Sequence, residues 1–275
     1  MDDSVRNLAI ALFAMLGLHG ALQERINRAA KQQLTEAFAG RGRMDVSVAP
    51  HGVFGVEAND LYEVDVTGVG IMSDRLPLYV FSRRGWKGHI RHLRLHFSDV
   101  TLRGLHVKDY RADIPSVSYD LGHALYRGRL VLRGTGAGPA AVTVTAEDLR
   151  EFVLKKYTPR LSEINVDFKD SEIAIQGTER IFGKASFRTI GGLIPREGRY
   201  LDLDPNETVL QLNGSVVNDV TKIGILKLVN PVLDIESDLG LRGYFSIEWI
   251  EIRSDDLVIH GRARVPDAPT GTDSP

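Results

Sequence analysis

Three histidines lie close together in the middle of the chain, and histidine is a common ligand of zinc. Apolar and polar residues alternate around His92 and His96, and this alternation predicts a strand. On a strand these two histidines share a face but stand about 13 Å apart at roughly 3.3 Å per residue. Zinc holds its nitrogen ligands at about 2.0–2.1 Å. The spacing therefore argues against a metal site that includes His89, His92 and His96, and so does the positive charge of Arg94 between the last two.

Pairs of acidic residues recur in the second half of the chain, and paired carboxyl groups can serve as general acid and base. The pairs are Asp202 and Asp204, Asp234 and Glu236, and Asp255 and Asp256. They fall at predicted strand ends, turns and termini, and nothing in the sequence makes two of them face one cleft. The chain also has no serine-hydrolase elbow, zinc-protease motif, Walker A loop or EF-hand loop. We therefore expect no enzyme and no cofactor, although an enzyme acting on lipid or glycan remains an alternative.

The glycine-rich segment Gly134–Gly138 has the composition of a phosphate-binding loop but not its context. It lacks the lysine of such loops and is followed by Pro139 and a strand-like run instead of a helix. We therefore predict that this segment is a flexible break between two parts of the chain.

Basic residues are concentrated in one part of an otherwise balanced chain of 275 residues with a net charge of -2. Residues 1–73 carry a net charge of -3, residues 74–133 carry +7, and residues 134–275 carry -6. The overall balance argues against a general nucleic-acid-binding protein. The absence of cysteine excludes disulfides, thiolate metal sites and a lipidated cysteine anchor.

The basic part is densest around an aromatic residue. Arg83, Arg84 and Lys87 flank Trp86 in a loop-like segment. Such a segment suits an anionic membrane surface, where each cation contributes roughly 1 kcal/mol. The alternative is a solvated strand face whose charges meet the acidic C-terminal part of the chain.

The first part of the chain contains an apolar run from Leu8 to Leu22. If this run is a helix with a rise of about 1.5 Å per residue, it is shorter than the ~30 Å hydrocarbon core of a bilayer. The acidic leader and the lack of a small-residue cleavage site differ from a signal peptide. We expect residues 1–21 to form an apolar anchor or the start of the first helix, and the side of the membrane stays open.

Helical and strand-like patterns alternate along the rest of the chain. Helical spacing is predicted for residues 22–38, for the segment from Thr145 to about Pro159, and for residues 220–228. Strands are predicted at residues 44–48, 64–69, 78–81, 92–97, 100–102, 112–118, 130–133, 164–168, 173–176, 184–190, 200–203, 209–216, 244–253 and 257–265.

This order predicts one α+β domain over residues 22–266 in which amphipathic helices cover the sheets. Each of the first two helices is followed by an alternating strand and a turn, so the domain divides into candidate halves at 22–139 and 140–266. The polar residues 267–275 are expected to form a disordered tail.

Several segments together resemble the LmeA-like phospholipid-binding proteins of bacteria. They are LQERINRAAKQQL, MDVSV, LYEVDVTGVGI, VTVTAEDLREFVLKKY, VNPVLDI and LVIHGRARV, and the resemblance spans roughly residues 8–265. It implies a lipid-binding protein of the cell envelope, with a fold similar to tubular lipid-binding domains. In such folds a long, curved antiparallel sheet wraps a helix and leaves an apolar groove. The chain differs from better-known members in having no lipobox.

A lipid groove would need apolar side chains that face a cavity. The candidates are the stripes of the first two helices, namely Ile26, Leu34, Phe38, Leu149, Phe152, Val153 and Tyr157. Ordinary core packing is the alternative for each of them. We expect non-enzymatic binding or transfer of a phospholipid or similar amphiphile at an anionic membrane surface. A structural or scaffolding envelope protein with a filled core and no ligand is the competing prediction.

Overall fold

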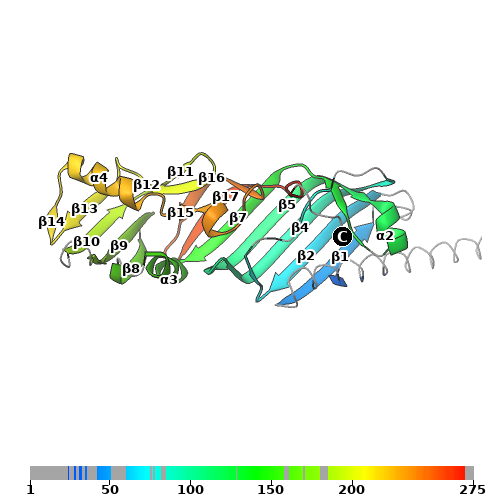
Figure 1. Ribbon diagram of the computed structural model, residues 1–275, viewed down its shortest axis with the longest axis horizontal. Helices are drawn as coiled ribbons and strands as arrows, with labels where there is room; N and C mark the ends of the chain where they lie inside the picture. The colour runs from blue at the N-terminus through cyan, green and yellow to red at the C-terminus, as the bar shows by residue number, and fades with distance from the viewer. Residues whose placement is uncertain are drawn as a thin grey trace, which may run out of the picture.

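The alternating sequence produces long strands with one buried face, and these strands run obliquely across an elongated body (Figure 1). The computed structural model describes Glu24, Arg28, Lys31, Gln32, Thr35 and residues 42–50, 60–74, 76, 78–81, 85–127, 129–157, 161–169, 171–179 and 185–269. The described chain is mostly β-sheet with few helices, and its sheets are largely antiparallel. This confirms the α+β class.

The larger sheet has nine strands and occupies the right-hand part of the molecule in Figure 1. Its strands are β1 (Arg43–Pro50), β2 (Asp60–Val69), β3 (Met72–Ser73), β4 (Lys87–Leu102), β5 (Leu105–Asp120), β6 (Leu132–Gly134), β7 (Gly138–Thr145), β16 (Phe245–Ile252) and β17 (Asp256–Ala263). The main order is β1-β2-β4-β5-β7-β17-β16, with β3 on β4 and β6 on β5. Because β7, β16 and β17 continue the sheet that β1 to β5 begin, both candidate halves contribute to it.

The β4–β5 hairpin is the longest feature of this sheet. Its strands extend the shorter runs predicted around His92–Phe97 and residues 112–118, and they pair from Lys87 opposite Asp120 down to Leu102 opposite Leu105. Along β4 the leucines, Phe97 and Val100 are buried while the intervening polar residues are exposed or partly buried. The two-residue turn has positive φ at both positions, which suits a tight hairpin turn.

Two smaller sheets complete the fold. The five-stranded sheet, in the order β14-β13-β10-β9-β8, consists of β8 (Leu161–Lys169), β9 (Glu172–Glu179), β10 (Ala185–Gly191), β13 (Val209–Leu212) and β14 (Ser215–Val216). The three-stranded sheet consists of β11 (Leu193–Arg196), β12 (Tyr200–Leu203) and β15 (Leu233–Asp234). The single strand predicted at 209–216 is divided because Asn213 and Gly214 form a turn with positive φ, for which Asn-Gly is the favoured sequence.

Four helices have both ends within the described residues: α2 (Leu121–Arg127), α3 (Ala146–Tyr157), α4 (Asp219–Val229) and α5 (Ile235–Asp238). The predicted capping box of α3 is present, since the amide of Asp148 donates to Thr145 Oγ1 over 3.1 Å. The side chain of Asn218 caps α4 by accepting from the amide of Thr221. Helix α2 was not predicted from the sequence.

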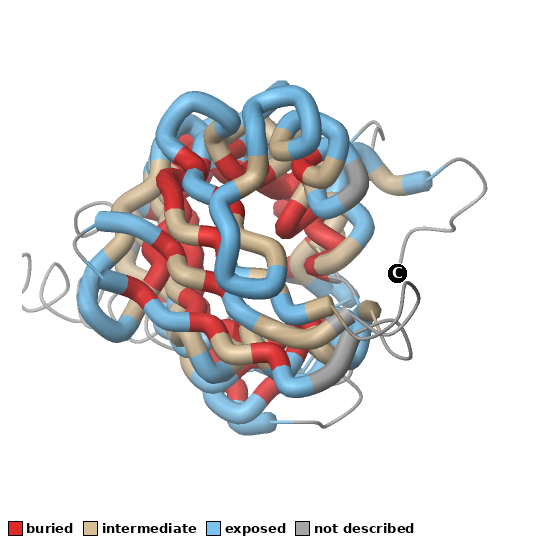
Figure 2. Tube along the Cα trace, turned by 90° about the vertical axis from the view of Figure 1, so that its left-hand side faces the viewer, coloured by how far each residue is buried: buried red, intermediate tan, exposed pale blue. Residues whose placement is uncertain are grey.

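The buried apolar residues of all three sheets form one continuous core, visible end-on in Figure 2 as the inward-facing part of the chain. The segment between β3 and β4 contributes Leu76 and Val80 to this core. Tyr244 holds the segment in place, because its hydroxyl oxygen lies 2.5 Å from the carbonyl oxygen of Leu76 and 2.6 Å from that of Leu78. The run predicted as a strand at 78–81 therefore makes only bridges, from Val80 to Leu132 and to Asp267.

Two segments differ from the sequence predictions, and a third is described only in part. The glycine-rich segment is not a flexible break: the Gly136 amide donates to Pro115, and a side chain at Gly138 would collide with the carbonyl oxygen of Asp113. Within the tail, Asp267 bridges to Val80, while residues 270–275 lie outside the described residues. All five described residues within 22–38 are helical.

Replacement of Tyr244 by phenylalanine should lower the free energy of unfolding by roughly 1–3 kcal/mol, because the carbonyl groups of Leu76 and Leu78 lose the one hydroxyl donor that they share. Urea unfolding followed by circular dichroism measures this change. Tyr126→Phe is the matched control, since Tyr126 is 74% exposed and should give no measurable loss. Equal losses in the two variants would contradict the role assigned to the Tyr244 hydroxyl.

Candidate functional site

One end of the nine-stranded sheet carries two exposed aromatic rings in contact. Trp86 immediately precedes β4 and is 62% exposed, and Tyr126 on α2 is 74% exposed. Their ring centroids lie 6.3 Å apart in an edge-on arrangement. Large aromatic side chains that remain this exposed are suited to a surface with an apolar and a polar layer.

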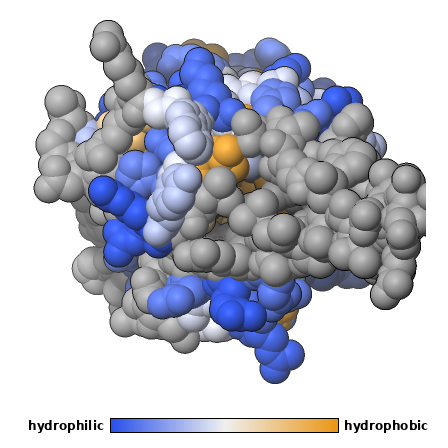
Figure 3. Space-filling model, turned by 90° about the vertical axis from the view of Figure 1, so that its right-hand side faces the viewer, coloured by the Kyte–Doolittle hydropathy of each residue, from blue (hydrophilic) through white to orange (hydrophobic). Residues whose placement is uncertain are grey.

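Cations surround this aromatic pair. Lys87 follows Trp86, Arg127 follows Tyr126, and both side chains are exposed. We call these four residues, Trp86, Lys87, Tyr126 and Arg127, the aromatic–basic end. Figure 3 faces this end of the molecule and shows hydrophilic side chains around a small hydrophobic area. Arg83 and Arg84, predicted to act with Trp86, lie outside the described residues.

Asp120 connects the two aromatic elements beneath the surface. The amide of Leu121 donates to the carbonyl of Trp86 over 2.9 Å, so α2 begins directly beside the Trp86 segment. The buried carboxylate of Asp120 accepts from the amide of His123 over 3.0 Å and lies 3.8 Å from Arg133. Burial by itself raises the pKa of Asp120, but His123 and Arg133 outweigh burial and hold that pKa below its usual range.

The remaining charges of the basic segment are largely neutralised on the outer face of the nine-stranded sheet. Ion pairs join Arg91 to Asp60, Arg94 to Glu63 and Arg111 to Asp109 at 2.7–3.0 Å. The rings of His92 and His96 lie within hydrogen-bond distance of Asp113 and Asp109, at 3.0 and 2.8 Å. Most partners come from the neighbouring strands β2 and β5. The C-terminal part contributes Asp256, which pairs with Lys108 over 2.8 Å. On β4 and β5 the basic residues thus belong to a solvated strand face on which they meet acidic partners, as the alternative prediction had it. At the aromatic–basic end, Lys87 and Arg127 have no acidic partner within the described structure.

The predicted groove residues of the second helix lie where α3 meets two sheets. Leu149, Phe152 and Val153 are buried in the continuous core, and Tyr157 is partly buried against it. Helix α3 contacts β8 of the five-stranded sheet together with β5 and β7 of the nine-stranded sheet. The other three candidates, Ile26, Leu34 and Phe38, lie outside the described residues.

Each acidic pair singled out in the sequence has at least one member in an ion pair with a basic side chain, and Asp234 and Glu236 share Arg199. Asp202 accepts from Arg196 over 2.6 Å, and Arg199 binds both oxygens of Asp234 at 2.8 and 2.6 Å. The Arg199 guanidinium holds the pKa of Asp234 well below its usual range. Among the described residues, no group of three histidine or acidic side chains is placed to hold a metal ion.

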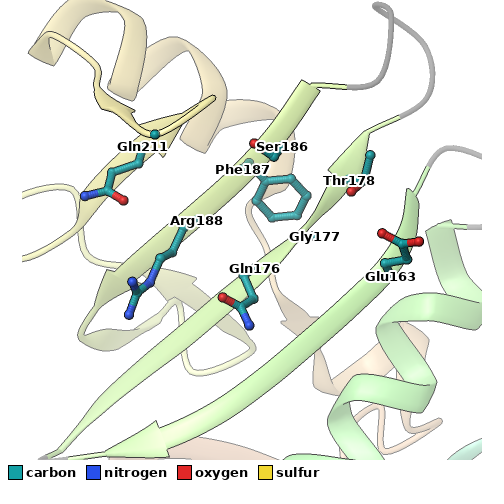
Figure 4. A pocket seen from close by; sticks show the side chains of 9 residues that line it. Glu163, Gln176, Gly177, Thr178, Ser186, Phe187, Arg188 and Gln211 are labelled. Atoms are coloured by element: carbon teal, nitrogen blue, oxygen red, sulfur yellow. The ribbon is translucent and has the colours of Figure 1, made fainter.

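A second candidate site is an open hollow of about 360 Å³ on the five-stranded sheet (Figure 4). Its lining is mostly polar and comes from β8, β9, β10, β13 and the turn after β13. The lining residues are Glu163, Gln176, Gly177, Thr178, Ser186, Phe187, Arg188, Gln211 and Gly214. This hollow was not predicted from the sequence, where its only signals are an Asn-Gly turn and polar residues at alternate strand positions.

No family model, curated protein or solved structure matches this chain. The resemblance to LmeA-like proteins therefore stays a prediction. Within the described residues, no helix has both the length and the apolar composition needed to cross a membrane. The apolar run at residues 8–22 lies outside them.

Replacement of Asp120 by asparagine should lower the free energy of unfolding at pH 7 by about 2 kcal/mol, because the charge that strengthens the hydrogen bond from the His123 amide and attracts Arg133 is lost. A carboxyl group with a depressed folded pKa stabilises the protein above its unfolded pKa and loses this contribution as the pH falls through its folded pKa. The difference between the wild type and Asp120→Asn should therefore shrink below about pH 4.

Urea unfolding at pH 7 and pH 3 measures both effects. Asp99→Asn is the control, because Asp99 is 65% exposed and lies 3.9 Å from its histidine partner, so only a small change is expected. A difference for Asp120→Asn that is the same at both pH values would contradict the assignment.

Proposed function

We propose that this protein is a non-enzymatic binder of a phospholipid or similar amphiphile at the bacterial cell envelope. In this proposal the aromatic–basic end docks on an anionic membrane. The observation that carries the proposal is the contact between the exposed rings of Trp86 and Tyr126, flanked by Lys87 and Arg127. The side of the membrane is left open.

The physical chemistry of the aromatic–basic end supports reversible membrane contact. Tryptophan and tyrosine favour the interface between headgroups and acyl chains, where one part of the ring is apolar and another can form hydrogen bonds. Four cations, Lys87, Arg127 and the neighbouring Arg83 and Arg84, would contribute together roughly 4 kcal/mol at an anionic surface. This corresponds to about a thousandfold preference for the surface, which is enough for docking and weak enough for release.

The position of α3 supports an amphiphile site in the body of the protein. In a tubular lipid-binding arrangement, long curved antiparallel sheets wrap amphipathic helices, and ligand lies between helix and sheet. Helix α3 contacts both sheets, and its side chains Leu149, Phe152 and Val153 are buried. A ligand chain could enter along this apolar stripe if the helix moved away from β8.

A specific observation favours the second candidate, a structural or scaffolding envelope protein without a ligand. The same α3 side chains belong to one continuous core with the strands that face them. A protein that needs no ligand would use this stripe for packing alone, and it could still touch the membrane with its aromatic–basic end.

Vesicle flotation tests membrane docking. The full chain should float with vesicles that contain phosphatidylglycerol and much less with pure phosphatidylcholine vesicles. The double variant Trp86→Ala/Tyr126→Ala and the triple variant Arg83→Ala/Arg84→Ala/Lys87→Ala should each reduce the bound fraction at least fivefold. Increasing salt should weaken wild-type binding, because exposed charges are screened.

Trp249→Ala provides a matched control for the aromatic variants. Trp249 is 51% exposed but stacks on His260 in a different part of the sheet, so its loss should leave flotation unchanged. Equal binding of wild type and both multiple variants, or equal binding to neutral and anionic vesicles, would contradict docking by this end.

Native mass spectrometry of freshly purified protein separates the two candidate functions. A lipid-binding protein should carry a discrete added mass that lipid extraction removes. The variant Phe152→Trp, which enlarges the α3 stripe, should reduce the lipid-bound fraction, and Glu151→Gln on the exposed side of α3 should not. The bare mass in every preparation, also after incubation with phospholipid, would favour the structural candidate.

A further inference from the structure

The solvent face of the five-stranded sheet carries a row of polar side chains in register. Arg188 on β10 pairs with Gln176 on β9 and with Gln211 on β13. Register partners project from the same face of a sheet, and neighbouring strands are about 4.8 Å apart. Figure 4 shows these three side chains extending in the same direction. We call Gln176, Arg188 and Gln211 the amide–arginine row.

The arginine of this row has no partner among the described residues, although it lies on the central strand of its sheet. Most other arginines on described strands bind a carboxylate or a carbonyl group; examples are Arg91, Arg94, Arg111, Arg196 and Arg262. The side chains of Gln176 and Gln211 likewise form no hydrogen bond within the described structure. Five guanidinium donors and two carboxamide groups are therefore available to a ligand.

Side chains that can form hydrogen bonds with hydroxyl groups lie two residues away from Gln176 on β9 and from Arg188 on β10. Thr178 and Ser186 are register partners and line the same hollow. The Asn213 side chain accepts from the Ser186 amide over 3.0 Å and from the Ser186 hydroxyl over 3.4 Å, which leaves the hydroxyl oxygen as an acceptor. Glu163, at a bulge in β8, supplies a carboxylate on the opposite side of the hollow from Gln211 (Figure 4).

The combination of the amide–arginine row with Glu163 favours a phosphate ester with hydroxyl groups over a carboxylate or a bare anion. A carboxylate has two oxygens, and one arginine fork can bind both. A phosphate ester offers more acceptor oxygens, so the flanking amides can bind it as well. The carboxylate of Glu163 would repel a bare anion but can accept hydrogen bonds from hydroxyl groups. A volume of about 360 Å³ is at the low end for small-ligand sites, which fits a single ring.

We propose that the hollow binds the phosphate ester of a small polyol, with the amide–arginine row on the phosphate and Glu163 on the hydroxyl groups. The ligand is either a soluble phosphate ester of a sugar or of inositol, or the headgroup of an inositol lipid. The site lies at the opposite end of the molecule from α2 (Figure 1), so it does not depend on membrane docking by the aromatic–basic end.

Isothermal titration of the full chain with myo-inositol 1-phosphate, inorganic phosphate and myo-inositol tests the proposal. Inositol 1-phosphate should bind saturably and more tightly than inorganic phosphate, and myo-inositol should not bind measurably. Arg188→Gln should weaken binding of both phosphate probes at least tenfold. Glu163→Gln should weaken binding of inositol 1-phosphate while leaving inorganic phosphate unchanged or tighter.

Arg43→Gln is the matched control, because Arg43 is an exposed arginine on β1 of the other large sheet without a partner in the described structure. It should bind every probe like wild type, and so should Trp86→Ala/Tyr126→Ala. The absence of saturable binding, or equal losses for Arg188→Gln and Arg43→Gln, would overturn the proposal. Circular dichroism confirms that each variant is folded.

Flotation with phosphatidylinositol vesicles then identifies the source. Binding that is lost in Arg188→Gln but retained in Trp86→Ala/Tyr126→Ala assigns the site to a lipid headgroup. Binding of soluble inositol 1-phosphate without Arg188-dependent flotation assigns it to a soluble phosphate ester. Failure of membrane docking by the aromatic–basic end would change neither titration, so the two proposals fail independently.

Discussion

The β4–β5 hairpin must satisfy two different environments at once, and the rest of the fold depends on this constraint. Side chains alternate between the two faces of a strand, so one face of the hairpin supplies Leu93, Leu95 and Phe97 to the core. The other face carries charges toward water. Strand β2 and the partner strand of the hairpin place carboxylates beside those charges, and their pairing allows a highly basic segment to form the centre of a sheet.

Because many of these cations are paired with carboxylates, the net charge of the basic segment does not show how many cations are available to a partner. Exposed ion pairs contribute little stability, typically 0.2–1 kcal/mol each, but they cancel the field that the strand cations would create. The cations of the basic segment that remain available within the described structure lie at the open end of the hairpin, near Trp86 and α2. Asp120 is the link between them: it ends β5, caps α2 and lies next to the Trp86 segment. The aromatic–basic end is thus built on a buried carboxylate.

The two candidate sites are physically different and lie at opposite ends of an elongated body. The aromatic–basic end has protruding rings and flexible cations, which suit a broad and fluid surface. The hollow of the five-stranded sheet has side chains held in register by strand pairing, which suits a small ligand of defined shape. Between them, α3 contacts both sheets and couples the two parts through the core.

The sequence alone determined the features that depend on neighbours a few residues apart. The capping box at Thr145 and the apolar stripe from Leu149 predicted α3, and alternation predicted most strands, because both signals arise within one element. Helix α2 was missed because it is short and its cap at Asp120 lies at the end of a strand. Only the tertiary structure decided which carboxylate neutralises which cation and which polar residues line the hollow. These side chains come from separate strands, and strand order and register, which bring them together, are set by the packing of the whole core.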